Sequence, residues 1–363
     1  MLKKAGKELA KALKVTLLTV NVLCILGLWA CAAAQFVPPQ EHARLSLLGL
    51  VFPVFLIATA VFVPLWLVLR WRWVWVPVAG MLLCAGSIRT FFPLNWPREA
   101  PEGSIRVLTF NTYNLPVPAG EQLTDFPSFR YILESGADIV CCQEAPGLGR
   151  GSADSLLATV YPYRSYPTSR TASFAMLSKF PILSEEPIDY ESQTNSSFAY
   201  RLLVGEDTVL LLNNHFESYR LQPSDRADFQ DLIHGTKEEE AMEMSLRSLC
   251  AKVTGANVVR GPQADSVAAY VQRAPEKYII LCGDFNDPTI SYIHHRLTRQ
   301  LNDAYTRSGN GPGISYHMSG MYFRIDNILC SPSIKAYGAR VDRSVSTSDH
   351  YPLTCLLEMR NEE

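Results

Sequence analysis

The uncharged stretch at residues 45–69 constrains the fold of this chain more than any other feature. It covers 25 positions without a charged side chain, and about 20 apolar residues suffice for a helix to cross a bilayer core. Residues 15–33 are uncharged over 19 positions and residues 73–88 over 16. The third stretch is short, but Arg72 and Arg89 flank it and can reach the two interfaces. We therefore predict three transmembrane helices.

A cleavable signal sequence is the alternative for the first stretch. Residues 30–34 offer the small side chains that signal peptidases require, and acylation at Cys31 is a further alternative. Two more apolar stretches follow, however, and the first stretch is longer than a usual signal core. These features favour membrane spans that are retained in the mature protein.

The distribution of Lys and Arg predicts the orientation of these spans. Five lysines precede the first stretch, whereas Arg44 is the single basic residue in the next loop and Arg70 and Arg72 lie in the one after it. Basic loops stay in the cytoplasm. We therefore expect a multi-pass protein of a bacterial inner membrane, with a cytoplasmic N-terminus and the rest of the chain in the periplasm. If the third stretch does not cross, the rest is cytoplasmic.

The charge balance divides the chain into a membrane domain and a globular domain. Residues 1–100 hold ten Lys and Arg against three Asp and Glu, whereas residues 101–363 hold 23 against 32. A Pro-rich segment lies between the two parts. We predict a membrane domain at 1–92, a linker at 93–104 and a catalytic domain at 105–363.

The globular domain shows short apolar, β-branched runs with helical patterns between some of them. Because strands and helices alternate only partly, we expect mixed β-sheets with helices outside rather than one parallel sheet. The predicted strands are residues 105–111, 138–144, 174–178, 198–204, 209–215, 278–285, 324–330 and 353–359. The predicted helices are residues 126–135, 226–252 and 263–272.

Polar clusters stand at the ends of these runs. One such cluster is an ordinary turn signal, but six in one domain indicate a shared site. Carboxylate and amide oxygens suit Mg²⁺ or Mn²⁺, and histidines beside aspartates suit acid–base chemistry or phosphate contact. The clusters are Asn111, Gln143-Glu144, Asn213-Asn214-His215, Gly283-Asp284-Phe285-Asn286, Arg324-Ile325-Asp326 and Ser348-Asp349-His350.

In this order and spacing the clusters resemble the motifs of the endonuclease/exonuclease/phosphatase superfamily, over roughly residues 105–357. The resemblance implies an α/β, four-layer sandwich of two mixed β-sheets flanked by helices, here preceded by the three transmembrane helices. It also implies a metal-dependent hydrolase of phosphate esters. For the metal, Mg²⁺ or Mn²⁺, it implies Glu144 as the principal ligand, Asn111 beside it and Asp349 as a further carboxylate.

The resemblance assigns the reaction itself to five other residues. Asp284 would orient or deprotonate the attacking water, and Asn286 would hold that water or the phosphate. His215 and His350 would contact the scissile phosphate. Asp326 would pair with His350 and fix its tautomer.

Other polar residues carry weaker expectations. Arg324 could reach a phosphate or form a surface salt bridge. His294 and His295 are expected as a surface or helix-start pair, and Tyr316 and His317 as part of a substrate rim.

The substrate class stays open between a lipid, a small molecule and a nucleic acid. The acidic domain argues mildly against duplex DNA, because nucleic-acid binders usually carry a basic footprint. A phosphate ester near the membrane is therefore preferred, a membrane-anchored nuclease is the alternative, and a non-catalytic binding domain is a weaker one. The bilayer is the expected partner, through three helices, and nothing in the sequence implies a protein partner.

Overall fold

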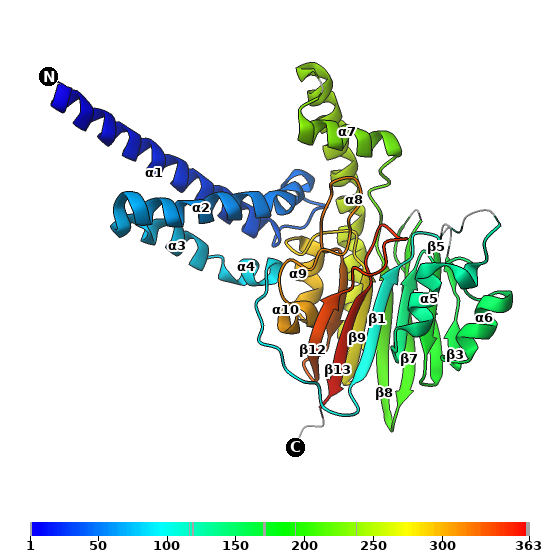
Figure 1. The fold of residues 1–363 in the computed structure, drawn as a ribbon. Coiled ribbons are helices and arrows are strands. Elements are labelled where there is room, and N and C mark those ends of the chain that lie inside the picture. The colour runs from blue at the N-terminus through cyan, green and yellow to red at the C-terminus, as the bar shows by residue number, and fades with distance from the viewer. Residues whose placement is uncertain are drawn as a thin grey trace.

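The chain forms a helical N-terminal part that projects from one side of a two-sheet domain (Figure 1). This computed structural model describes residues 2–115, 117, 120–169, 172–192, 194–236 and 238–360, so the last three residues of the predicted catalytic domain lie outside it.

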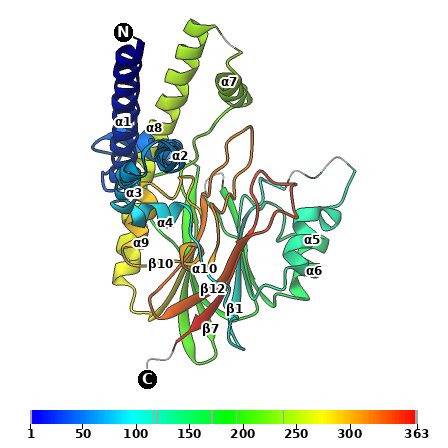
Figure 2. The same ribbon diagram turned by 60° about the vertical axis from the view of Figure 1, so that its left-hand side comes forward.

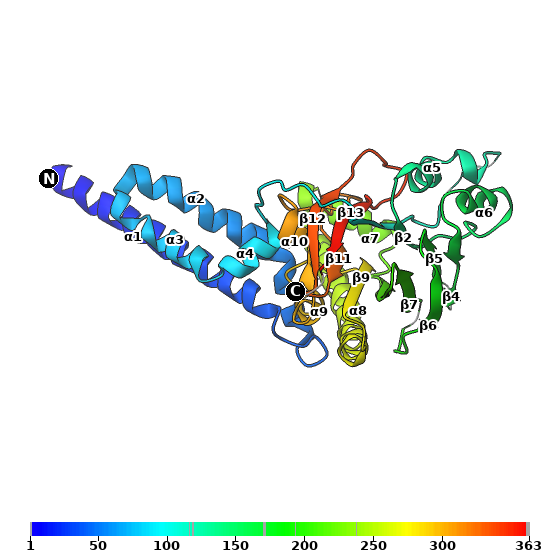
Figure 3. The ribbon, with the colours of Figure 1, turned by 90° about the horizontal axis from the view of Figure 1, so that it is seen from below.

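The N-terminal part is a bundle of antiparallel segments. Helix α1 (Leu2–Ala34) runs toward the two-sheet domain, and α2 (Phe52–Arg70) runs back from it after the 3₁₀ helix η1 (Ala43–Val51). The short η2 (Trp71–Trp73) precedes α3 (Trp75–Leu82) and α4 (Ala85–Phe91), which return beside α1 and α2 to the domain (Figure 3).

The prediction of a third transmembrane helix is wrong. Within the described residues two helical stretches are long and apolar enough to cross a membrane, Lys4–Ala34 and Ala43–Trp73, with mean hydropathies of 2.1 and 2.5. The third predicted stretch divides into α3 and α4, of eight and seven residues, because the backbone leaves helical geometry at Cys84 (φ −119°, ψ 27°). Gly80 and Gly86 flank this break, and glycine is a poor helix former.

Two mixed β-sheets form the rest of the fold. The order in the first sheet is β12 (Ile334–Val341), β13 (Leu353–Met359), β1 (Ile105–Asn111), β2 (Ile139–Gln143), β5 (Ala172–Ser178) and β3 (Tyr163–Ser165), with β4 (Thr168–Ser169) on β5. The order in the second sheet is β10 (Asn302–Asp303), β11 (Asp326–Cys330), β9 (Tyr278–Asp284), β8 (Asp207–His215), β7 (Ser196–Val204) and β6 (Ile182–Pro187). The β1–β2 and β8–β9 pairs are parallel and the others antiparallel.

Helices cover the outer face of each sheet, which confirms the predicted α/β sandwich (Figure 2). One apolar core lies between the sheets, from Val107 and Met176 on one side to Leu211 and Ile280 on the other. The first sheet packs outward on α5 (Pro127–Glu134) and α6 (Gly151–Ala158), with η3 (Leu123–Asp125) alongside. The second packs on α8 (Glu239–Arg273) and α9 (Tyr292–Thr298), while α10 (Ala304–Ser308) lies beside β12.

The helical region after β8 differs from its prediction as one helix at 226–252 and another at 263–272. Helix α7 (Pro223–His234) ends at Gly235, whose left-handed backbone (φ 64°) caps the helix by donating its N–H to the Asp231 carbonyl. The following helix, α8, then continues through Pro262 to Arg273. A glycine C-cap, rather than the apolar pattern, therefore determines where the helix ends.

The two-sheet domain and the N-terminal part meet at the loop between α1 and α2. The backbone of Gly49 packs so closely on Ile290 that a Cβ atom would lie 1.9 Å from the Ile290 carbonyl oxygen. Asn257 in α8 donates to the Ser46 hydroxyl over 2.7 Å, and the rings of Phe36 and His295 lie 4.7 Å apart. These contacts fix the domain at the end of the bundle that is remote from the N-terminus.

Candidate active site

Strand register brings the predicted site residues to one end of both sheets. Asn111 pairs with Gln143 across the parallel β1–β2 pair, so Glu144 follows directly beside it. In the second sheet Asp284 lies between His215 and Asp326 as their cross-strand partner. A chain of contacts between 2.7 and 4.0 Å connects all eight predicted residues, Asn111, Glu144, His215, Asp284, Asn286, Asp326, Asp349 and His350.

Amide groups hold the Glu144 carboxylate. The Asn111 Nδ2 donates to Glu144 Oε1 over 3.3 Å and to Asp284 Oδ2 over 3.0 Å. The Asn114 Nδ2 donates to Glu144 Oε2 over 2.9 Å. Glu144 has a left-handed backbone with a φ of 51°, a conformation that costs about 1–3 kcal/mol in a residue other than glycine. Such strain is typical of a functional position.

Gly283 allows β9 to approach β8 closely at the position before Asp284. Its φ is 130°, and a Cβ atom there would lie 1.9 Å from the Asn214 carbonyl oxygen, so only glycine fits. The Asn286 N–H donates to Asp284 Oδ1 over 2.7 Å, and the Asn286 side chain donates to the Phe216 carbonyl over 3.0 Å. The turn after β9 therefore orients the Asp284 carboxylate.

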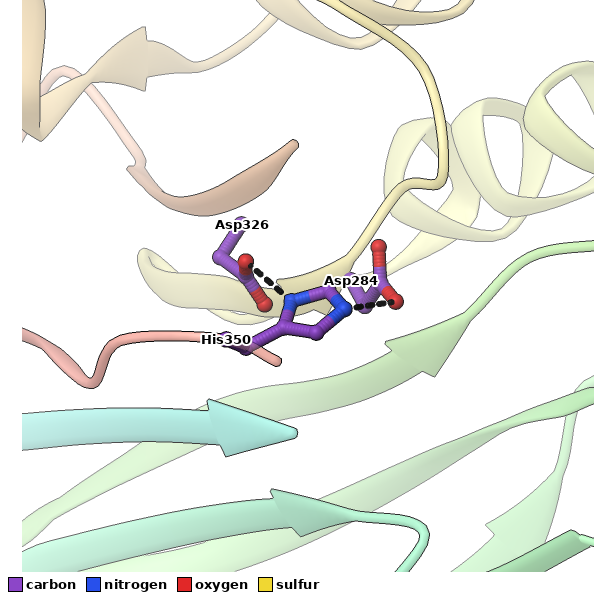
Figure 4. Close-up of side chains that lie close together, drawn as sticks. All are labelled: Asp284, Asp326 and His350. Carbon is purple, nitrogen blue, oxygen red and sulfur yellow. Dashed lines mark hydrogen bonds and ion pairs between the residues drawn. The ribbon is translucent and has the colours of Figure 1, made fainter. Parts of the chain in front are cut away.

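His350 lies between two buried carboxylates (Figure 4). Its Nδ1 donates to Asp326 Oδ2 over 2.7 Å, and its Nε2 lies 3.7 Å from Asp284 Oδ2. Burial disfavours the imidazolium, but the charges of Asp326 and Asp284 outweigh it and raise the pKa of His350 well above its usual value. His350 is therefore a cation over the neutral range, with Nε2 turned toward the other site residues.

The remaining carboxylates repel one another. Burial raises the pKa of Asp349 to about 6, and Glu144 and Asp284 add to the rise, while His350 and Arg226 oppose it. Burial also raises the pKa of Asp284, together with the charge of Asp326 and against the pull of His350 and His215. This crowding favours a bound cation.

His215 is a buried histidine whose ring points at two carboxylates. Its Nε2 lies 3.6 Å from both Glu144 Oε1 and Asp284 Oδ2, and neither ring nitrogen has a hydrogen-bond partner within the described residues. A buried, unpaired polar group is costly, so a ligand that accepts a hydrogen bond would relieve it.

The site fits a divalent cation beside Glu144 and Asp349. Asp349 Oδ1 is buried without a hydrogen-bond partner among the described side chains, and the Glu144 oxygens accept from neutral amides. Among the described residues, Asp284, Asp326 and His350 form another group of metal-ligand types, with ligand atoms within 4.8 Å of one another. In that group, however, the His350 Nδ1 is bonded to Asp326 and the His350 ring is charged, so the ring cannot ligate a metal ion. We therefore favour Glu144, Asp349 and Asn111 as the metal ligands.

One residue of the site, Arg226, was not predicted from the sequence, and two predicted residues, Arg324 and His294, have other partners than expected. Arg226, in the first turns of α7, places NH2 4.0 Å from Asp349 Oδ2. No local signal distinguishes Arg226 from other helix arginines.

Arg324 is neither a phosphate contact nor a surface salt bridge, because it is buried in a bidentate salt bridge with Asp303, with N–O distances of 3.0 and 3.2 Å. His294 starts α9 as expected, but it is buried and bonded to Asp303.

The rim residues lie beside the site. The Tyr316 ring contacts the His350 ring edge-on at 5.1 Å, and His317 stacks on Tyr351 at 3.8 Å. Burial of Tyr316 next to Asp349 raises its pKa to about 12, so its hydroxyl stays protonated at neutral pH.

Comparison with known proteins agrees with this geometry. The model of the endonuclease/exonuclease/phosphatase family matches residues 108–350, and that of a domain of unknown function (DUF8431) matches residues 14–91. A search of curated proteins found no match.

Several solved structures are similar to this chain. An endonuclease/exonuclease/phosphatase from Beutenbergia cavernae DSM 12333 has 17% identity and a TM-score of 0.50, over 70% of this chain and 72% of that chain. D. rerio TDP2 complexed with a single-strand DNA product has 14% identity and a TM-score of 0.49, over 71% and 100%. A Bacteroides vulgatus endonuclease/exonuclease/phosphatase has 16% identity and a TM-score of 0.48, over 71% and 100%.

The family model extends from the middle of β1 to His350 and covers more than half of the sequence. The chain therefore belongs to the endonuclease/exonuclease/phosphatase family of phosphoester hydrolases.

Proposed function

We propose that this protein is a divalent-metal-dependent phosphoester hydrolase that acts at a membrane surface. The observation that carries the proposal is His350, a buried cation between Asp326 and Asp284, next to the crowded carboxylates Glu144 and Asp349. A cationic donor beside a site for a metal is the arrangement that stabilises charge on a phosphate.

Each residue then has a distinct role. Mg²⁺ or Mn²⁺, held by Glu144 with Asn111 and Asp349, would neutralise charge on the phosphate. Asp284 accepts a proton from the attacking water, which its buried position and raised pKa favour. His350 donates to the phosphoryl oxygen or to the leaving oxygen.

Two further residues would hold the substrate in line. His215 donates to the phosphate through a ring nitrogen that has no partner within the described residues. Asn286 holds the attacking water or the phosphate. Asp326 is a positioning residue, because it acts through the His350 ring.

The helical hairpin formed by α1 and α2 supports the proposal that the protein acts at a membrane. In the most apolar 18-residue segment of each helical stretch, only 33% and 22% of the residues are buried. In α2, for example, Ile57 is 65% exposed and Val68 is 85% exposed. A core helix would be mostly buried, so this apolar surface fits lipid. A signal sequence at the N-terminus is the alternative for α1, but it does not account for α2.

The same hairpin supports an orientation. The catalytic domain contacts the α1–α2 loop. The N-terminus of α1, where the lysines lie in the sequence, and the end of α2, which is Arg70, point away from the domain (Figure 3). If α1 and α2 cross a bacterial inner membrane with the basic end in the cytoplasm, the catalytic domain lies in the periplasm. Neither α3 nor α4 is long enough to span a bilayer alone, but together they return the chain to the α1–α2 loop (Figure 3), so the expectation of a cytoplasmic domain without a third span does not apply. Its substrate would then be a phosphate ester outside the cytoplasm.

A substrate panel on the purified full chain tests the activity. It compares a phosphodiester, a phosphomonoester, phospholipid vesicles and a single-stranded oligonucleotide, each with Mg²⁺, with Mn²⁺ and with EDTA. We expect metal-dependent hydrolysis that His350→Ala abolishes and that His234→Ala, an exposed histidine of α7, leaves unchanged. Hydrolysis of the oligonucleotide alone would favour the nuclease alternative, and no hydrolysis of any ester would refute the proposal.

A further inference from the structure

We propose that a basic groove beside the edge strand β12 binds the headgroups of anionic phospholipids at the bilayer surface. The groove has a volume of about 920 Å³ and lies between the linker after α4 and the outer edge of β12 and α10. It includes none of the proposed catalytic residues, which lie at the ends of β1, β2, β8 and β9, at the start of β11 and just before β13.

All the charged side chains that line the groove among the described residues are basic. Seven basic side chains line it, and none of its described lining residues is acidic. This concentration stands in a domain whose acidic residues outnumber its basic ones. The basic residues are Arg89, Arg98, Arg307, Lys335, Arg340, Arg343 and Arg360.

Several of these charges form no salt bridge within the described residues, although the charge of Arg340 also acts on the Asp342 carboxylate. Arg360 lies 3.9 Å from Glu358, and Arg307 donates to the Asn302 side chain. In the described part of the chain, Arg98, Arg340 and Arg343 form no salt bridge. Cations kept together without carboxylate partners repel one another, so an external anion would stabilise them.

The groove also lies at the correct place for a bilayer. The Asn95 Nδ2 donates to the Gly309 and Thr306 carbonyls over 2.6 and 3.2 Å, and the Gly311 N–H donates to the Pro93 carbonyl over 2.9 Å. These bonds hold the linker against the domain directly after α4, on the side from which the helical bundle projects (Figure 1). Clusters of basic residues next to a membrane segment bind anionic lipid.

Exposed apolar side chains in the groove wall favour a lipid surface over a polynucleotide as the ligand of the groove. Trp96 is 90% exposed and Leu94 71% exposed, and both belong to the groove wall. Tryptophan and leucine beside basic residues are typical of a segment that lies at the headgroup boundary. A nucleic acid strand would stack on Trp96 but offers no apolar phase for Leu94.

The test measures binding to the full chain in a zwitterionic detergent, with EDTA present to prevent hydrolysis. The ligands are dioctanoyl phosphatidylglycerol, dioctanoyl phosphatidylcholine, inorganic phosphate and a single-stranded oligonucleotide, each titrated by calorimetry. The test variant is Arg98→Gln/Arg340→Gln/Arg343→Gln. The matched control is Arg130→Gln/Lys179→Gln/Arg247→Gln, which removes the same charge from exposed positions outside the groove.

We expect phosphatidylglycerol to bind more tightly than phosphatidylcholine or phosphate. The test variant should weaken this binding on the order of 100-fold, at about 1 kcal/mol for each basic residue lost, and the control less than threefold. Equal binding of the two lipids, an unaffected test variant, or groove-dependent binding of phosphate or oligonucleotide alone would each overturn the proposal.

The outcome is separable from the catalytic proposal. The test variant should hydrolyse a small soluble ester at the wild-type rate, because none of its three arginines contacts the catalytic residues. Lipid binding without hydrolysis would refute only the catalytic function, and hydrolysis without lipid binding would refute only the groove.

Discussion

The pairing of Asp326 with His350 makes a quantitative prediction. The hydrogen bond is 2.7 Å long, and the side chains of His350 and Asp326 are 5% and 0% exposed, so solvent screens it little. A hydrogen bond to a charged group contributes about 1.5–3 kcal/mol. If the transition state uses the whole interaction, Asp326→Asn should lower kcat/KM by about 10- to 150-fold, since about 1.4 kcal/mol is tenfold in rate.

Removal of the ring should cost more than removal of its partner. His350→Ala deletes the donor to the phosphate, and such groups contribute about 10²- to 10⁴-fold. Because Asp326 acts only through the ring, the double variant should be no slower than His350→Ala alone. Asp326→Asn should leave the fold unchanged, because the Ser315 hydroxyl still accepts from the backbone N–H of residue 326.

The assay is kcat/KM of the four proteins on the best substrate of the panel, with circular dichroism as a control for folding. Losses that multiply in the double variant would mean that the two residues act independently, which would refute the dyad. A loss of less than threefold in Asp326→Asn would equally contradict the magnitude derived from the geometry.

Three further predictions concern other parts of the molecule. Arg226→Gln should raise KM at least tenfold with little loss of stability, because Arg226 lies on the site side of α7; steady-state kinetics checks it, and an unchanged KM would remove Arg226 from the site. Burial opposes the charge of Asp303, but Arg324 and His294 hold the pKa of its carboxyl well below the usual range. The charged carboxylate therefore stabilises the fold at neutral pH, and this stabilisation is lost as the pH falls below about 4. Asp303→Asn should therefore cost about 3–5 kcal/mol at pH 7 and less in acid, measured by denaturant unfolding at both pH values. A C-terminal reporter should be active in the periplasm; activity confined to the cytoplasm would refute the proposed orientation.

The polar ends of the strands could be predicted from the sequence because they follow apolar runs. Strand β1 was predicted at its observed bounds, and β9 to within one residue. The carboxyl ends of the parallel neighbours β1 and β2, and of β8 and β9, share a sheet edge, so the pattern indicates which terminal side chains lie together there. Asp326, at the start of β11, and Asp349 and His350, before β13, were placed in the same site by the family resemblance. The edge strands β6 and β12 were missed because their exposed faces are polar and interrupt the apolar pattern.

Other features depend on contacts between distant segments. The break between α3 and α4 occurs within an apolar run that reads as one span, and only local backbone geometry at Cys84 divides it. The burial of Arg324 depends on Asp303 and on the Thr90 carbonyl at the end of the membrane part, which accepts from Arg324 over 2.9 Å. No sequence pattern predicts a contact between residues 234 positions apart.

The most direct test of the central claim measures metal binding and hydrolysis together. Mn²⁺ binding to the wild type, Glu144→Gln and His350→Ala would be measured by electron paramagnetic resonance, alongside phosphodiester hydrolysis. We predict that His350→Ala binds Mn²⁺ but does not hydrolyse, and that Glu144→Gln does neither, because an amide is a poor substitute for a ligating carboxylate. Wild-type Mn²⁺ affinity and full hydrolysis in Glu144→Gln would contradict the account.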